Sequence, residues 1–254
     1  MNRRIAYQTI LRREIRRFAR IWPQTLLPPV ITTSLYFLIF GTLIGERIGD
    51  MDGKPYMEYL VPGIILMAVI SNSYNNVVSS FYSTKFQRHI EELLIAPVPN
   101  WVILSGYVSG GVARGLIVGF VVALVSGFFT QLNVHHYGVA AAVMVLTAIL
   151  FSLAGFINAT LANSFDDVSI IPNFVLTPLT YLGGVFYSID LLPDFWQKIS
   201  LVNPILYMVN AFRYGLIGVS DIDVVTAFLI VGLFVVVLVL TSLFLLHRGI
   251  GIKV

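Results

Sequence analysis

Long apolar runs alternate with short polar stretches along almost the whole chain. Each run is bounded by charged, proline-containing or glycine- and asparagine-containing stretches. A helix that crosses a bilayer needs about 20 apolar residues, and the runs reach that length. The pattern therefore predicts an all-α membrane protein with six transmembrane helices, at residues 24–45, 60–81, 102–130, 138–162, 168–188 and 224–246.

The composition agrees with this class and narrows it. Hydrophobic residues make up 57% of the 254 residues and charged residues 11%, against about 25% charged in soluble domains. Little of the chain remains for an aqueous domain, so we expect a single transmembrane domain over residues 1–254. Because cysteine is absent, disulfides, thiolate nucleophiles and cysteine-based metal sites are excluded. The N-terminus shows no small-residue cleavage pattern, which predicts a retained first anchor.

Two segments outside the apolar runs are predicted to lie at the membrane surface. Residues 189–222 are too interrupted to span the membrane, and Pro193 and the Asn203-Pro204 pair predict two short re-entrant or interfacial helices. Residues 3–22 form a basic amphipathic helix on the inner leaflet when drawn on a helical wheel. Its arginines either fix the topology alone or also hold a partner. They are Arg12, Arg13, Arg16, Arg17 and Arg20.

The distribution of basic residues predicts the orientation of the chain. Eleven lysines and arginines lie in the N-terminal segment, the second connection and the tail, whereas four lie in the first connection and in residues 189–222. The positive-inside rule then places both termini in the cytoplasm. An even number of spans agrees with this, since it places both termini on the same side.

The second apolar run contains an unusually polar helix face, and weaker polar faces occur in the first and fifth runs. Such faces either bond neighbouring helices or border a wet path, because they cannot face lipid cheaply. Three such helices can enclose a route across the membrane, although ordinary bundle packing explains the same residues. The second run contributes Asn72, Asn75, Asn76, Ser79 and Ser80, spaced i, i+3, i+4, i+7 and i+8, and the others contribute Thr25, Thr32, Tyr36, Asn173, Thr177, Thr180 and Tyr181.

The third run combines glycines with one charge. Glycines at every fourth position from Gly111 to Gly119 predict close helix packing. Arg114 lies among them, and a charge at the bilayer centre costs about 2.5–3.5 kcal/mol on insertion scales. We therefore expect Arg114 in the cytoplasmic half of the span, either snorkelling or paired with Asp166 or Asp167.

Motifs for catalysis are absent from the sequence. It contains no G-x-x-x-x-G-K-[ST] phosphate loop, no H-E-x-x-H zinc motif and no G-x-S-x-G elbow. The His135-His136 pair has no acidic ligand set beside it. An intramembrane enzyme therefore has little support, and we expect no catalytic residue, cofactor or metal in this chain.

The stretch QRHIEELLIAPVPN separates the second and third runs. Residues 90–95 support one or two helical turns, Pro97 stops the helix, and Pro99 stiffens the return to the membrane. A short amphipathic helix of this kind suits docking into a groove of a partner. Its apolar side carries Leu93, Leu94 and Ile95, and its charged side carries Arg88, Glu91 and Glu92.

Over essentially its whole length the chain resembles the ABC-2 type transporter permeases. The resemblance lies in the basic amphipathic N-terminal helix, the six runs, the loop R-x-I-E-E-L-L-x-x-P-V-P and the segment 189–222. It implies a homodimer in which each subunit binds a separate ATPase subunit, which carries ATP and magnesium, and export by alternating access. It makes residues 86–98 the coupling helix and places 3–22 beside the ATPase. The short helices in 189–222 then help to close an outer gate.

The same resemblance assigns roles to individual residues. One departure is that this chain lacks the large extracellular domain of some relatives, so schemes of substrate handling that depend on it do not transfer. The expected ATPase contacts are Arg88, Glu91, Glu92, Leu93, Leu94 and Pro97, with Asp166 and Asp167 in a smaller second contact at residues 163–167. The first, second and fifth helices are expected to line the path, through Thr25, Thr32, Tyr36, Asn72, Asn75, Asn76, Ser79, Asn173, Thr177 and Tyr181.

The pattern and the resemblance together predict the membrane subunit of an ATP-driven exporter in the bacterial inner membrane. Its expected partners are an ABC ATPase, a second copy and membrane lipid, with no nucleic acid. The polar faces carry little charge, which favours an amphiphile, a lipid-linked glycan or a hydrophobic drug as substrate. The alternative is an ion-driven carrier or channel that works without an ATPase. Such a protein more naturally places carboxylates at mid-membrane, whereas the acidic residues here lie in loops or near run ends.

Overall fold

The computed structural model describes residues 3–131 and 134–251, apart from the side chains of Glu46, Leu93 and Leu94. In the described part of the chain the regular structure is helical except for one small hairpin. Its strands, β1 (Asp50–Met51) and β2 (Lys54–Pro55), pair antiparallel. The predicted all-α class is confirmed.

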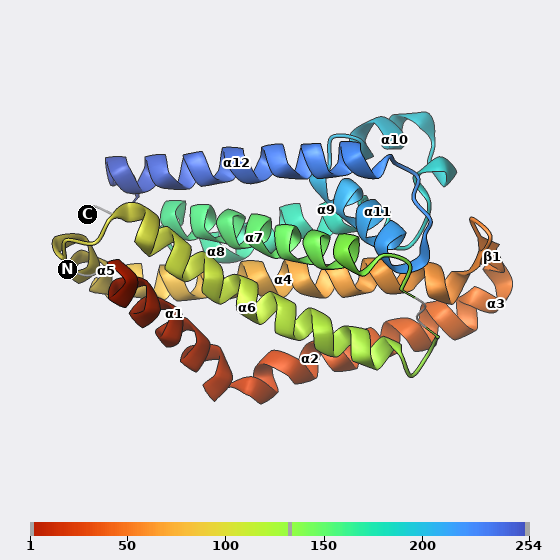
Figure 1. Cartoon of the computed structure of the whole chain (residues 1–254), viewed down its shortest axis with the longest axis horizontal. Helices are drawn as coiled ribbons and strands as arrows, with labels where there is room; N and C mark the ends of the chain where they lie inside the picture. Colours follow the sequence, from red (N-terminus) through yellow and green to blue (C-terminus); the bar gives the residue numbers. More distant parts are fainter. Residues whose placement is uncertain (1–2, 132–133, 252–254) are drawn as a thin grey trace.

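The helices run between two ends of an elongated bundle (Figure 1). One end, called here the α5 end, holds the start of α1 (Arg3–Arg20), the short helix α5 (His89–Ile95) and the end of α12 (Val224–Arg248). The opposite end, called the hairpin end, holds the β-hairpin with the short helix α3 (Gly45–Ile48) before it, and α10 (Asp194–Ser200).

Five helices in the described residues are long and apolar enough to cross a membrane. They match the first, second, third, fourth and sixth predicted runs. They are α2 (Trp22–Tyr36) continued by the π-helical η1 (Phe37–Ile44), then α4 (Tyr56–Phe86), α6 (Asn100–Ser126), α7 (Tyr137–Leu161) and α12. Helices pair most of their own peptide groups, as lipid requires, although Pro28, Pro29 and Pro62 interrupt the bonding within α2 and α4.

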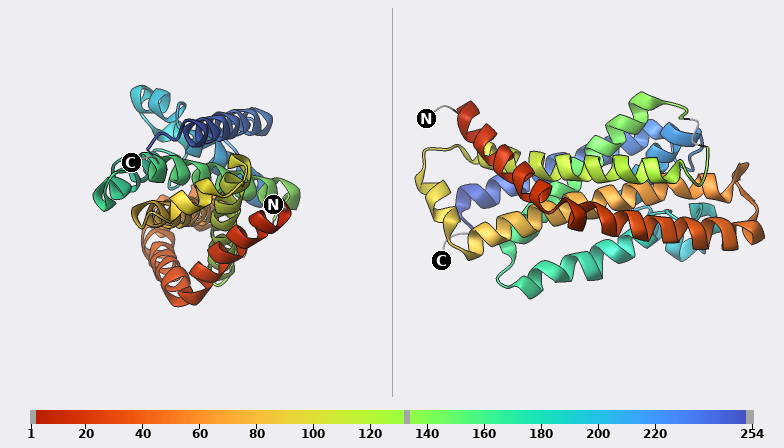
Figure 2. Two further views of the ribbon diagram at one scale, coloured as in Figure 1. Left: turned by 90° about the vertical axis from the view of Figure 1, so that its left-hand side faces the viewer. Right: turned by 90° about the horizontal axis from the view of Figure 1, so that it is seen from below.

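The fifth predicted run is helical but shorter than expected. It ends at Tyr181 because Gly183 and Gly184 turn the chain, and Gly184 has a left-handed φ of 70°. Figure 2 shows this helix at the edge of the bundle, and its first turns contact α4 and α7. It consists of α8 (Phe165–Ile171), η2 (Pro172–Leu176) and α9 (Thr177–Tyr181).

The centre of the bundle is α4, which packs along α6 and α7. In its most apolar window 72% of the residues are buried, against 22% in α12. The exposed side of α12 carries leucine and valine side chains such as Leu229, Leu233 and Leu240. This difference is typical of a central helix and a lipid-facing helix.

Glycines of α6 allow α1 to pack closely across it. The buried side of α1 carries Ala6, Ile10, Glu14 and Phe18, so a carboxylate lies within a face that the helical wheel predicts to be apolar. A Cβ on Gly106 would lie 2.6 Å from Ile10 Cγ2, and a Cβ on Gly110 would lie 2.5 Å from Glu14 Cβ. Only glycine permits so close an approach.

The predicted glycine series in α6 faces α4. Cβ atoms on Gly115 and Gly119 would clash with the side chains of Ser73 and Val69. The prediction of close helix packing is confirmed, and the partner helix is the one that carries the strongest polar face.

Residues 189–222 form short helices at the hairpin end, broken where the prolines predict. Pro204 is the first residue of α11, and the Asn203 side chain accepts a hydrogen bond of 3.0 Å from the backbone N–H of Ile205. Most of α11 is buried against α4, α7 and α12. The segment comprises η3 (Ile189–Leu191), α10 and α11 (Pro204–Ile217).

Candidate functional site

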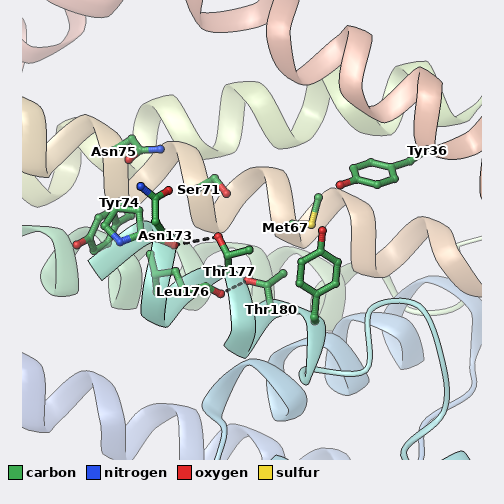
Figure 3. A pocket seen from close by; sticks show the side chains of 11 residues that line it. Tyr36, Met67, Ser71, Tyr74, Asn75, Asn173, Leu176, Thr177 and Thr180 are labelled. Atoms are coloured by element: carbon green, nitrogen blue, oxygen red, sulfur yellow. Dashed lines mark hydrogen bonds between the residues drawn. The ribbon is translucent and has the colours of Figure 1, made fainter. Parts of the chain in front are cut away.

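A cleft of about 290 Å³ lies between α4, the first long helix and the α8–η2–α9 helix (Figure 3). It brings together residues from the three predicted polar faces. These are Tyr36, Asn75, Asn173, Thr177 and Tyr181, and we call this space the first cleft.

The polar groups of the first cleft differ in whether they have hydrogen-bond partners within the protein. The Thr177 hydroxyl donates to the Pro172 carbonyl at 2.9 Å and the Thr180 hydroxyl to the Leu176 carbonyl at 2.7 Å. Both hydroxyls therefore bond within their own helix. The side-chain amides of Asn75 and Asn173 have no hydrogen-bond partner among the described residues. These two amides are free to bond a substrate or water.

Four aromatic rings cluster between the first long helix, α9 and the turn after it. The Phe186 ring lies 5.7 Å from both Tyr36 and Tyr181 and 5.3 Å from Phe40, measured between ring centroids. The Tyr56 hydroxyl donates to the Phe186 carbonyl at 3.0 Å, which ties this turn to α4. Tyr36 and Tyr181 thus belong to an aromatic cluster at the hairpin end of the cleft, which their polar character alone does not predict.

A second cleft, also of about 290 Å³, lies between α2, α4 and α6. Met67 and Ser71 line both clefts, so α4 forms the wall between them. The Asn72 amide donates to the Ala68 carbonyl at 3.0 Å, within α4 itself. The predicted path residues in this second cleft are Thr25, Thr32 and Asn72.

Arg114 lines the second cleft and makes no salt bridge with Asp166 or Asp167. Its Nε atom is buried without a hydrogen-bond partner among the described residues. The predicted pairing is wrong because Arg114 faces α2 and α4, whereas both aspartates lie at the start of α8.

Asn76 and Ser79 bond α1 and line neither cleft. The Arg17 guanidinium donates to the Asn76 side-chain oxygen at 2.8 Å and to the Ser79 hydroxyl at 3.3 Å. The Ser80 hydroxyl donates to Glu14 Oε1 at 2.7 Å. Here the polar face of α4 serves helix packing, the alternative that the sequence left open.

Glu14 is the centre of this contact, and sequence reasoning missed it. Its side chain is fully buried between Arg17, at 3.3 Å, and Arg13, at 3.5 Å. Arg13 also donates to the Tyr107 hydroxyl at 2.5 Å. The burial of Glu14 is indicated in the sequence by its position four residues after Ile10 and four before Phe18, on the face of α1 that is buried.

The stretch QRHIEELLIAPVPN, predicted to be a cytoplasmic loop, contains α5, which follows the end of α4. Ile90 is buried, whereas Arg88, Glu91, Glu92 and Pro97 are exposed and make no ion pair in the described part of the chain. Arg88 has a left-handed φ of 60°, which turns the chain between the two helices. The side chains of Leu93 and Leu94 lie outside those that the structure describes.

The second predicted contact lies beside α5. The Phe165 ring packs against Phe86 at 5.1 Å between centroids. Backbone N–H groups of Asn163 and Ser164 bond the Asp167 carboxylate at 2.9 and 3.2 Å, forming a capping box. These hydrogen bonds hold the pKa of Asp167 below its usual range, and the bond from Asn163 contributes most. Asp167 therefore fixes the start of α8, while Asp166 is exposed.

A second buried charge, also missed, lies at the hairpin end. Arg213 of α11 is fully buried, donates to the Gly184 carbonyl at 2.5 Å and lies 3.8 Å from the centroid of the Tyr59 ring. Its counter-charge is Asp221, at 3.9 Å. Burial raises the pKa of Asp52 in the β-hairpin, and the negative charge of Asp221 raises it further. The signal in the sequence was one arginine within the apolar stretch that forms α11.

These features define a multi-pass membrane protein with two polar-lined clefts and an exposed, charged short helix at one end. Residues 5–217 match the family described as ABC-2 type transporter. The chain belongs to this family.

Two relatives place the chain further. It is similar to the inner membrane transport permease YadH of Escherichia coli (strain K12), with 57% identity over 249 residues, 98% of this chain and 97% of that protein. It is also similar to nodulation protein J of Sinorhizobium fredii (strain NBRC 101917 / NGR234), with 27% identity over 182 residues, 71% of this chain and 69% of that protein.

The family confirms several predictions made from the sequence. The chain is an inner-membrane ABC-2 permease without an ATPase domain of its own, and its work depends on an ABC ATPase partner. No nucleotide site is part of this family, and no cluster of metal-ligating residues occurs in the residues that the structure describes. An ion-driven carrier and an intramembrane enzyme do not fit the family.

Proposed function

We propose that the chain is the membrane subunit of an exporter in which a permease homodimer binds two ATPase copies. The α8–η2–α9 helix is the fifth of six spans, and both termini lie in the cytoplasm at the α5 end. ATP is hydrolysed on the partner, and this chain converts movement of the partner into movement of the bundle.

The observation that carries this proposal is the continuity of α4 between α5 and both clefts. The turn to α5 is held by backbone bonds from Gln87 N–H to the Ser83 carbonyl at 3.1 Å and from Arg88 N–H to the Lys85 carbonyl at 3.0 Å. Ile90 anchors α5 in the core with 1% of its surface exposed. A displacement of α5 is therefore passed to α4, which forms the wall between the clefts.

The surface of α5 supports its role as the coupling helix. Its exposed carboxylates, Glu91 and Glu92, have no charge partner in the described chain, so an ATPase groove lined with basic residues fits them. The loop at residues 163–167 lies beside α5 through the Phe86–Phe165 contact and forms the smaller second contact.

The two clefts supply the substrate path between an inward-open and an outward-open state. The aromatic cluster around Phe186 closes the hairpin end of the first cleft, which is the outer side in this orientation. Uncharged amides and hydroxyls beside apolar side chains suit an amphiphilic substrate, a lipid-linked glycan or a drug.

The coupling role is tested by the double variant Glu91→Gln/Glu92→Gln in vesicles reconstituted with the ATPase. We expect substrate- or permease-stimulated ATP hydrolysis to fall about tenfold, the equivalent of about 1.4 kcal/mol of coupling, because the charge-assisted contacts are lost. Insertion into the membrane should not change, since both side chains are exposed.

The matched control is Asp190→Asn/Asp194→Asn, which removes two exposed carboxylates at the hairpin end. It should leave stimulation unchanged. Full stimulation in the α5 double variant would show that α5 is not the lever.

A further inference from the structure

A cavity of about 900 Å³ lies between α1, the last turns of α4 and the start of α5. It is separate from both clefts. Its lining is strongly basic and contains no carboxylate among the described residues. The charged lining residues are Arg12, Arg13, Arg16, Arg17 and Arg20, with His89 of α5 beside them.

Two of the five arginines are held in place by the protein. Arg17 bonds Asn76, Ser79 and Glu14, and Arg13 bonds Tyr107 and Glu14. Glu14 is buried behind them and neutralises one positive charge. Even so, the Nε atom of Arg17 is buried without a partner in the described chain.

The other three arginines have no counter-charge. Arg12, Arg16 and Arg20 make no hydrogen bond or ion pair with any residue that the structure describes. Like charges gathered in one cavity repel one another, and a bound anion relieves that repulsion. Planar guanidinium groups form paired hydrogen bonds with carboxylates and phosphates, and a phosphate has enough oxygens to bond several of them at once.

The surroundings of the cavity favour an anion that carries an apolar tail. Ile21, where α1 meets the first long helix, lines the cavity, and Trp22 beside it is 59% exposed. The apolar side chain of Ile15 is also exposed on α1. A head group can therefore lie among the arginines while its tail remains beside apolar side chains at the bilayer surface.

The cavity also adjoins the polar face of α4. Arg17 joins it to Asn76 and Ser79, which continue the face that lines the two clefts. We propose that this cavity binds the phosphate-bearing head group of an amphiphile and presents it to the path. That this amphiphile is the transported substrate rests on the proposed function, whereas the binding site itself does not.

The test measures binding to the purified full chain in neutral detergent, without the ATPase. The probes are short-chain phosphatidic acid, phosphatidylcholine of the same chain length, and inorganic phosphate. In the variant Arg16→Gln/Arg20→Gln we expect the affinity for phosphatidic acid to fall at least about tenfold, since charge-assisted phosphate contacts are lost. Arg16→Lys/Arg20→Lys should recover part of the affinity, because it keeps the charge but loses the paired geometry.

The control variant Arg3→Gln/Arg248→Gln removes the same charge from the α5 end outside the cavity. It should change the affinity less than about twofold. Wild-type affinity in the cavity variant, an equal loss in the control, or inorganic phosphate binding as tightly as phosphatidic acid would each overturn the proposal. So would loss of ATPase copurification with unchanged lipid binding, which would make the arginines a partner surface.

The two proposals fail separately. Lipid binding is measured without an ATPase, so a failed coupling test at Glu91 and Glu92 leaves it standing. A failed lipid test with normal ATPase stimulation removes only the head-group site.

Discussion

Two buried charge clusters hold α4, one toward each end of the bundle, and they differ in how their charges are balanced. At the hairpin end Arg213 faces one carboxylate, Asp221, and the two side chains are 0% and 5% exposed. At the α5 end Glu14 is shared by Arg13 and Arg17, and three further arginines open onto a large cavity. A balanced pair stabilises one arrangement, whereas an unbalanced cluster keeps free charge for a ligand.

The surroundings of the two clusters reinforce this difference. Arg213 is enclosed by the Tyr59 ring, the Gly184 carbonyl and Asp221, which offset much of its desolvation, although its Nε atom is buried without a partner in the described chain. Arg17 is 32% exposed and Arg13 is 46% exposed, so water or a ligand supplies the rest of their hydrogen bonds. The hairpin-end cluster is therefore structural, and the α5-end cluster is open to binding.

The largest effect is expected for Asp221→Asn at the hairpin end. It leaves the buried Arg213 without a counter-charge and should lower the free energy of unfolding by about 3–5 kcal/mol. Thermal or denaturant unfolding in neutral detergent measures it. The double variant Arg213→Met/Asp221→Asn should lose less, because no unpaired charge stays buried. A double variant that loses more than Asp221→Asn would show that the contacts of Arg213 with Tyr59 and Gly184 stabilise the fold even without Asp221.

A smaller effect is expected for Glu14→Gln at the α5 end. The variant keeps an acceptor for Ser80 but weakens the bonds to Arg13 and Arg17, so unfolding should become easier by about 1–3 kcal/mol. Water reaches both arginines, which limits the loss. Proteolysis of α1 and unfolding in detergent measure it. A loss as large as that of Asp221→Asn would remove the contrast between the clusters.

The smallest effect is expected for Asp52→Asn in the β-hairpin. The pKa of Asp52 is raised in the folded protein, so its ionisation opposes folding once the pH passes the ordinary carboxyl value. The variant should be slightly more stable than the wild type at neutral pH and gain nothing below the ordinary carboxyl pKa. Asp50→Asn, which removes an exposed carboxylate from β1 of the same hairpin, is the control. A gain independent of pH would point to the left-handed backbone at Asp52 instead.

Local features of the sequence predicted much of the fold. Apolar runs of sufficient length gave the five long helices, and Pro193 and Pro204 gave the breaks before α10 and α11. The end of the fifth run was misplaced because Gly183 and Gly184 turn the chain inside an apolar stretch. Hydrophobic periodicity shows which residues share one face of a helix, but it does not show where the chain turns or what packs against that face.

Long-range contacts limited what could be predicted of the site. Periodicity grouped Asn72, Asn75, Asn76 and Ser79 on one side of α4, but it could not show that the first two line different clefts or that α1 covers the last two. Glu14 and Ser80 are 66 positions apart, and Arg213 and Gly184 are 29 apart. Pairings of this kind depend on how helices cross, which is set by packing and by glycines such as Gly110.

The length of α4 determines where the boundary of the membrane falls on this bundle. Its 31 residues extend about 46 Å at 1.5 Å per residue, while the hydrocarbon core is about 30 Å thick. Roughly ten residues must therefore project into the head-group layer or tilt to stay within the hydrocarbon. In the proposed orientation, with the hairpin end outside and the hydrocarbon beginning at Tyr56, the projecting part is the last ten residues, 77–86, which include Ser79 and Ser80. Bilayer thickness thereby sets how much of the arginine cavity is hydrated, so the same chain presents a wetter cavity in a thinner membrane.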